Sequence, residues 1–218
     1  QVAGERHVLA LTTAAQIQVT AEPARPIASA AALARSAETG PSAEDIPLEV
    51  VYEDPDIAII NKPSGLVVHP APGNREHTLV NALLYRFGEL SSVDPQRPGI
   101  VHRLDKETSG LLVVARNNNA HRKLAGQFEV HSIKRVYVAV VSGITRFDED
   151  VIEVPIGRHP IKREDMAAGV AKNAKYARTL YRTVKRGGSA TLLQLEPFTG
   201  RTHQLRVQLN ALGLPILG

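Results

Sequence analysis

Two segments near the end of the chain, residues 177–185 and 190–196, alternate between apolar and polar residues on either side of Gly187-Gly188. A period of two is the pattern of a half-buried strand, and paired glycines supply the backbone conformations that a tight turn needs. The segments are therefore predicted to form a β-hairpin. Such a hairpin builds an antiparallel sheet.

The remaining pattern alternates irregularly between short strands and helices. Predicted strands cover residues 48–53, 57–61, 111–115 and 134–141, and the first two are joined at the turn signal Asp54-Pro55-Asp56. One predicted helix begins at Thr78 and stops at Gly88, a second covers residues 118–131, and a third runs from Thr202 to Gly213. This order favours an α+β fold with a mixed, largely antiparallel central sheet and flanking helices over a doubly wound sheet.

The domain boundaries follow from composition. Residues 21–45 are rich in Ala, Pro, Ser and Glu and hold almost no large apolar residues, so we expect a flexible linker there. Residues 1–20 are then expected to be the tail of something larger, and the compact domain is expected to start at Ile46 and run to Gly218. Within it, the basic stretch 157–175 is expected to be an exposed loop.

Charge and residue content exclude several classes of function. The 218 residues contain no cysteine, and the eight histidines show no close ligand pairing, so neither thiol chemistry nor a metal site is expected. No apolar run is long enough to cross a membrane, and no signal pattern opens the chain, so a cytoplasmic location is expected. The net charge of +4 favours a polyanionic partner.

The stretch His102–Gly110 is the best candidate for chemistry. It is polar, ends in Ser-Gly, and lies between the apolar stretches Pro98–Val101 and 111–115, which are typical of buried strands. Its carboxylate, Asp105, fits a nucleophile, a general base or one half of a buried salt bridge. Three arginines are candidates to hold that carboxylate, and spacing alone does not choose among Arg103, Arg201 and Arg206.

Two further features have a structural and a functional interpretation. Tyr137 sits among valines in a predicted strand, where it is either a core residue or a platform for a nucleobase. The stretch Asn61–Pro70 contains two prolines and a glycine that fix a rigid loop, and taken alone it reads as an ordinary connector.

Four motifs taken together resemble one family, the RluA/RluD family of RNA pseudouridine synthases. Residues 102–110 are similar to its HRLDxxTSG signature and residues 61–70 to NKPxGxxVHP. Residues 134–143 are similar to KRxYxAxVxG, and residues 200–207 to GRTHQ(I/L)RV. The similarity is greatest to the RluD-like branch that acts on large-subunit ribosomal RNA, through residues 68–74 and 158–160.

The resemblance implies an α+β enzyme that isomerises uridine to pseudouridine in RNA without a cofactor. Asp105 would be the catalytic residue, whether it attacks C1′, adds to C6 or abstracts a sugar proton; Tyr137 would stack on the uracil, and Arg206 would pair with Asp105. Leu205 would form an apolar wall and Arg103 would contact RNA. The same motifs supply four more candidate substrate-binding residues, namely Asn61, Lys62, Arg201 and His203. The partner would be rRNA, or tRNA, and the protein a monomer.

The chain departs from the family pattern at its ends. Leu214 stands where the family usually has histidine, and the chain stops where the family's domain continues, so residues 46–218 are expected to form an incomplete catalytic domain. Residues 1–20 are a possible remnant of an S4-like RNA-binding domain. The alternatives are a noncatalytic RNA-binding or ribosome-assembly protein on the same fold, and an inactive truncated product.

Overall fold

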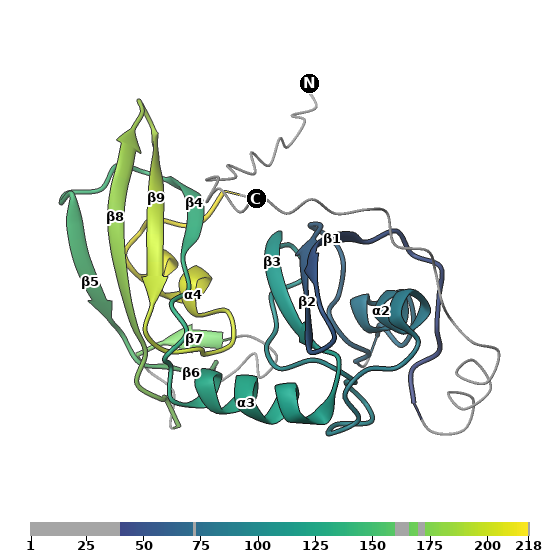
Figure 1. The fold of residues 1–218 in the computed structure, drawn as a ribbon. Helices are drawn as coiled ribbons and strands as arrows, with labels where there is room; N and C mark the ends of the chain where they lie inside the picture. Colours follow the sequence, from purple (N-terminus) through teal and green to yellow (C-terminus); the bar gives the residue numbers. More distant parts are fainter. Residues whose placement is uncertain (1–39, 72, 160–165, 170–172, 218) are drawn as a thin grey trace. The chain divides into compact units, whose positions relative to one another are not determined.

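The computed structural model describes residues 40–71, 73–159, 166–169 and 173–217 (Figure 1). These residues form two compact parts, an N-terminal part that ends at Val130 and a C-terminal part that begins at His131. Among the described residues, no helix has the length and apolar character needed to span a membrane.

The N-terminal part contains a three-stranded antiparallel sheet in the order β1-β2-β3. Its strands are β1 (Glu49–Glu53), β2 (Ile57–Lys62) and β3 (Gly110–Ala115). The turn before β2 forms because a carboxylate oxygen of Asp54 accepts the backbone N–H groups of Asp56 and Ile57. In the central strand β2 the buried side chains alternate, so Ala58, Ile60 and Lys62 share one face.

Helix α2 (Leu79–Phe87) begins and ends where its local signals predict. Thr78 precedes it, and the Asn81 side chain accepts the backbone N–H of Thr78 at 3.0 Å. Gly88 ends it with φ of 71°, a conformation that glycine adopts without steric cost. The helix start also binds the preceding chain, because the Asn81 amide donates to the carbonyl of Ser42.

Helix α3 (Asn118–Glu129) follows β3 and is capped by Asn117, whose side chain accepts the N–H of Ala120. Near its end, Phe128 stacks on the ring of His102 with ring centres 4.4 Å apart. This contact ties the helix to the loop that begins with His102.

The C-terminal part is built on a four-stranded antiparallel sheet in the order β4-β9-β8-β5 (Figure 1). The strands are β4 (Tyr137–Ser142), β5 (Glu149–Glu153), β8 (Arg178–Arg186) and β9 (Ala190–Pro197). Helix α4 (Gln204–Ala211) packs Leu209 into a core that also contains Val141, Leu193 and Leu195. The predicted hairpin is therefore confirmed as β8 and β9, the two central strands of this sheet.

Two local predictions were wrong. In the region of the predicted loop 157–175, β6 (Ile156–Arg158) pairs with β7 (Met166–Ala168) in a short antiparallel ladder, while residues 160–165 and 170–172 lie outside the described residues. The stretch Pro98–Val101 is not a strand; its contact with the sheet is one bridge between Ile100 and Val114. The strands β6 and β7 have three residues each, and Pro98–Val101 has four residues that include a proline and a glycine. Periodicity does not separate strand from loop over such short stretches.

The α+β prediction is confirmed, and every strand ladder among the described residues is antiparallel. The possible S4 remnant at residues 1–20 lies outside the described residues, as does most of the predicted linker. The end of that linker contacts α2, since the N–H of Glu44 donates to the carbonyl of Asn81.

Candidate active site

Asp105 lies on a turn that a second loop holds in place. The turn closes when the N–H of Thr108 donates to the carbonyl of Asp105 at 3.1 Å. The loop after β2 then binds the backbone beside Asp105, because the N–H of Gly65 donates to the carbonyl of Lys106 and the hydroxyl of Ser64 to that of Glu107. The stretch Asn61–Pro70 is thus a support for the candidate catalytic turn as well as a connector.

Lys62 is the centre of this support. The residue is fully buried, and its ammonium donates to the carbonyl oxygens of Pro63, Leu66 and Lys106 at 2.8, 2.9 and 3.0 Å. Burial lowers the pKa of Lys62 to about 8, while the charges of Glu107 and Asp105 act in the opposite direction. Lys62 was predicted to bind substrate; its placement suits a residue that positions Asp105 through the turn.

Asn61, the neighbouring substrate-binding candidate, lies at the end of β2 opposite Leu111. Its amide donates to a carboxylate oxygen of Glu49 on β1 at 2.8 Å. This bond joins β1 to the strand that carries Lys62.

Arg103 is exposed and extends from the loop that carries Asp105. Its Nη1 lies 3.4 Å from Nε2 of His69, and Nδ1 of His69 lies 3.1 Å from the carbonyl oxygen of Pro70. Because a carbonyl only accepts, Nδ1 carries the proton and Nε2 accepts from Arg103. His69, in the loop after β2, therefore orients Arg103, which lies two residues before Asp105 in the sequence.

The C-terminal part holds the other candidates. Tyr137 opens β4 opposite Leu195 of β9 and packs against the core cluster of this part. Leu205 packs against the same cluster from the first turn of α4. Arg206 lies in the first turn of that helix, since α4 begins at Gln204.

The start of α4 is held by a buried amide that sequence reasoning missed. The oxygen of the Gln204 side chain accepts the hydroxyl of Thr199 at 2.7 Å and the N–H of Arg201 at 3.0 Å. Its nitrogen donates to the carbonyl of Arg178 and the hydroxyl of Thr179. These bonds fix the loop before α4. The helix was predicted to start at Thr202, but the residue that directly precedes it is His203, which has a φ of 52°.

Arg201 and His203 were predicted to bind substrate. The Nε of Arg201 donates to the carbonyl of Tyr176, and Arg201 lies next to Gly200, which in turn adjoins the guanidinium of Arg135. The guanidinium groups of Arg201 and Arg135 and the exposed imidazole of His203 thus lie at the loop before α4.

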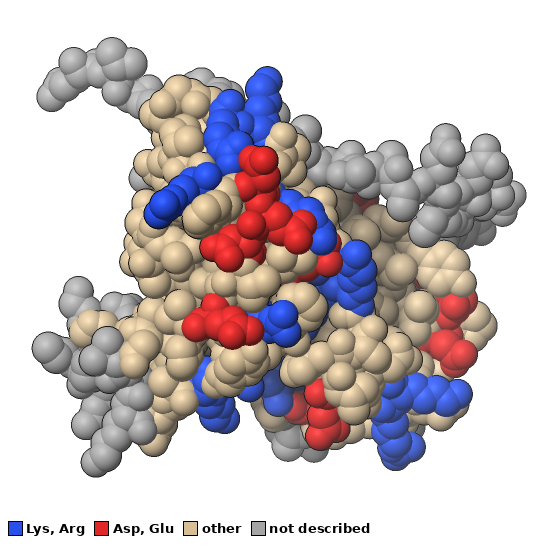
Figure 2. Space-filling view, turned by 90° about the vertical axis from the view of Figure 1, so that its left-hand side faces the viewer, with Lys and Arg blue, Asp and Glu red and all other residues tan. Residues whose placement is uncertain are grey.

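On strand β8 of the C-terminal part, basic side chains are paired with acidic ones. Arg178, Arg182 and Arg186 of β8 each pair with an acidic residue, respectively Glu153, Glu149 and Asp148. Figure 2, which looks at the molecule from the β5 side, shows acidic and basic side chains next to one another on this face. Paired arginines are weaker candidates for contacts with phosphate than the cations of the two loops described above.

The sequence candidates therefore fall into two sets. Asn61, Lys62, Arg103 and Asp105 belong to the N-terminal part, and Tyr137, Arg201, His203, Leu205 and Arg206 belong to the C-terminal part. The pairing of Asp105 with Arg206 stays a prediction. In the described part of the chain, no cluster of His, Asp and Glu side chains is suited to hold a metal ion.

Comparison with known proteins gives one consistent family. The model of the RNA pseudouridylate synthase family matches residues 56–211, a range that contains all four sequence motifs. An uncharacterized RNA pseudouridine synthase of Aquifex aeolicus is 49% identical over 178 residues, which is 80% of this chain and 56% of that protein. The ribosomal large subunit pseudouridine synthase D of Pseudomonas aeruginosa is 47% identical over 176 residues, covering 81% of this chain and 53% of that protein.

A solved structure is also similar. The human RNA pseudouridylate synthase domain containing 1 has a TM-score of 0.66 and 28% sequence identity, over 78% of this chain and 67% of that one. This chain spans about half the length of the curated relatives that it matches.

Proposed function

Because the chain belongs to the RNA pseudouridylate synthase family, we propose that it supplies the catalytic residues for isomerising uridine to pseudouridine in RNA. The observation that carries the proposal is the matched range 56–211, which includes Asp105 and the loop that clamps it. Side chains at the end of β2 and in the loop after it bond the backbone carbonyls of Lys106 and Glu107, the two residues after Asp105, and so support the turn that carries the carboxylate, as preorganised catalytic groups require.

The reaction is a rearrangement and needs no cofactor. The bond between N1 and C1′ of the uridine breaks, the uracil turns, and C5 joins C1′. The hydrogen of C5 leaves as a proton and N1 takes one up, so the product has the composition of the substrate. Release of the C5 hydrogen is therefore a direct signal of turnover.

The roles that we propose for the residues are those that the four family motifs imply. Asp105 is the catalytic carboxylate, and Arg206 pairs with it and keeps it ionised and aimed. Tyr137 stacks on the uracil, and Leu205 forms an apolar wall beside it. Arg103 contacts the RNA and helps to hold the target base out of its stack, which costs a few kcal/mol that RNA contacts must offset.

The substrate we propose is ribosomal RNA of the large subunit. Support comes from the name of the Pseudomonas aeruginosa relative, a ribosomal large subunit pseudouridine synthase, at 47% identity. We also propose that residues 46–218 belong to a catalytic domain, and that the protein is a monomer that works in the cytoplasm.

The test is tritium release from large-subunit rRNA labelled at C5 of uridine, with the longest available chain that contains these residues. We expect release with the wild type and with Glu107→Gln, a matched neutralised carboxylate on the same turn, and none with Asp105→Asn. RNA binding by Asp105→Asn should persist. Binding by the wild type without any release would instead favour the noncatalytic RNA-binding alternative.

A further inference from the structure

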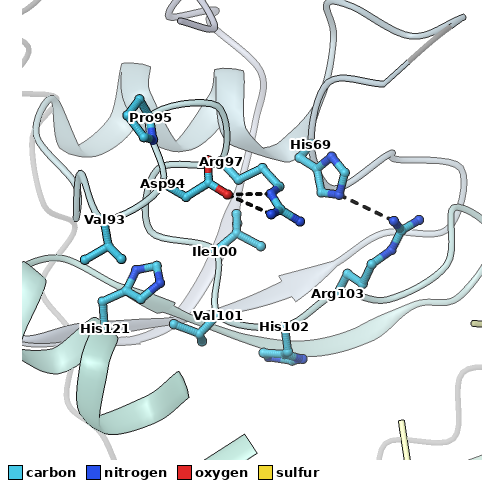
Figure 3. Close-up of a pocket in the computed structure, with 10 residues that line it drawn as sticks. All are labelled: His69, Val93, Asp94, Pro95, Arg97, Ile100, Val101, His102, Arg103 and His121. Carbon is cyan, nitrogen blue, oxygen red and sulfur yellow. Dashed lines mark hydrogen bonds and ion pairs between the residues drawn. The ribbon is translucent and has the colours of Figure 1, made fainter. Parts of the chain in front are cut away.

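The N-terminal part contains an open pocket of about 520 Å³ beside the loop that carries Asp105 (Figure 3). This volume lies within the range of roughly 300–1,000 Å³ that is usual for sites of small organic groups. All of its lining residues belong to the N-terminal part, so the pocket does not depend on where the C-terminal part lies. None of the candidate roles assigned above uses it, apart from Arg103 at its edge.

One wall of the pocket is apolar. Val93, Ile100 and Val101 line it, and the imidazole of His102 continues the same wall. His102 is fixed from two sides, because its Nε2 accepts the N–H of Val113 at 3.1 Å and its ring stacks on Phe128. Aliphatic groups and a fixed imidazole suit apolar contact and stacking with a nucleobase.

The rim of the pocket carries the guanidinium groups of Arg103 and Arg97, and the charge of Arg97 is balanced by a carboxylate. Arg103 extends along one side toward His69, as Figure 3 shows. On another side Arg97 is held by Asp94, with its Nε donating to the carboxylate at 2.8 Å. Guanidinium groups are the side chains best suited to contacts with phosphate oxygens, and the Asp94 carboxylate can accept from a base amino group.

His121 adds an unsatisfied polar atom to this pocket. The residue is only 7% exposed, and its Nδ1 has no hydrogen-bond partner among the described residues. Burial lowers the pKa of His121, which favours the neutral ring with one donor and one acceptor. Buried polar atoms without partners are uncommon in folded proteins, and this one lies beneath the surface of the pocket wall.

We propose that this pocket receives one unstacked nucleotide of the RNA, distinct from the uridine that is isomerised. Its base lies against Val93, Ile100, Val101 and His102, and its phosphate faces Arg103, which His69 orients. The inference rests on the proposed function, since it takes the RNA substrate as the ligand. It makes the pocket a selectivity site for the sequence or loop shape around the target.

The kinetic test fills the pocket without changing its charge. Val93 is 46% exposed, so Val93→Trp places a large ring at the pocket without disturbing the core, and Val51→Trp on β1 is the matched control at 40% exposure. We expect Val93→Trp to raise KM for the RNA about tenfold, the scale of one lost base stack, with kcat and melting temperature nearly unchanged. Val51→Trp should leave all three unchanged.

Abasic RNA identifies the nucleotide. For the wild type, removing the base at one position near the target should raise KM about tenfold. For Val93→Trp, KM should be the same with this abasic RNA as with intact RNA. If Val93→Trp matches the wild type on intact RNA, or if the two losses add in full, the nucleotide pocket is refuted. The proposed function would stand in either case, because the wild type still releases tritium.

A binding test is independent of catalysis. AMP, GMP, CMP and UMP are titrated separately into the protein while the imidazole NMR signals of His69, His102 and His121 are followed, with inorganic phosphate as the reference. At least one nucleotide should shift the signals of His102 and His121 where phosphate does not. Equal shifts with phosphate alone would show an anion site and overturn the base pocket, whether or not the chain is active.

Discussion

The ammonium of Lys62 donates a hydrogen bond to the backbone carbonyl of Lys106 across 3.0 Å, although the two residues are 44 positions apart in the sequence. Lys62 ends β2, and Lys106 follows Asp105 directly. The bond therefore connects a sheet strand to the candidate catalytic turn. It explains why a fully buried lysine is tolerated, since three carbonyl oxygens replace the water that its ammonium loses.

Replacing Lys62 should destabilise the N-terminal part. In Lys62→Met the carbonyls of Pro63 and Leu66 lose the donor that the structure gives them, and we expect the free energy of unfolding to fall by about 1–3 kcal/mol. Urea denaturation measures this change. Lys106→Met is the control, because its side chain is exposed and only its backbone is used; a loss equal to that of Lys62→Met would contradict the assigned role.

The pKa of Lys62 predicts a dependence of stability on pH. The pKa is lowered from 10.5 to about 8 by burial, so between these values the folded chain has released a proton that the unfolded chain retains. The unfolding free energy of the wild type relative to Lys62→Met should therefore rise as pH increases from about 8 to 10.5, and should be constant below that window. Denaturation of both proteins at several pH values measures it, and a flat difference throughout would argue for an ordinary lysine.

The pairing of Asp105 with Arg206 can be tested by cross-linking, because the chain contains no cysteine. If the two side chains meet, a short bismaleimide should join the double variant Asp105→Cys/Arg206→Cys within one molecule. The control is Asp105→Cys/Lys185→Cys. Arg178, at the first end of β8, binds the start of α4 through its carbonyl and Gln204, whereas Lys185 lies near the other end of that strand. Mass spectrometry of the digested protein should find the link in the first variant; equal linking in both would count against the pairing.

Tyr137 is proposed to stack on the uracil, and we propose in addition that its hydroxyl takes part in the transfer of the C5 proton. Tyr137→Phe keeps the ring, so KM for rRNA should be nearly unchanged while kcat falls. Tyr137→Leu fills similar space in the core but removes the ring, so KM should rise by about 5- to 100-fold. Steady-state tritium release measures both constants. Wild-type kinetics in both variants would exclude Tyr137 from the site.

The sequence by itself determined the features that depend on close neighbours. The hairpin of β8 and β9, the limits of α2 at Thr78 and Gly88, and the turn at Asp54 follow from periodicity and from groups a few residues apart. The four motifs also determined the family. By contrast, the ladder of β6 and β7 was missed, since each strand has three residues and its stability comes from pairing across a loop.

Only the tertiary structure decided what the buried polar groups do. The sequence shows a lysine before a proline at position 62 and a glutamine at position 204, and either side chain is ordinarily exposed. Folding brings the carbonyl of Lys106 to the ammonium of Lys62. It also brings the hydroxyls of Thr199 and Thr179 to the amide of Gln204. Such contacts depend on the path of the whole chain, because a buried donor or acceptor takes whichever partner lies near it in space.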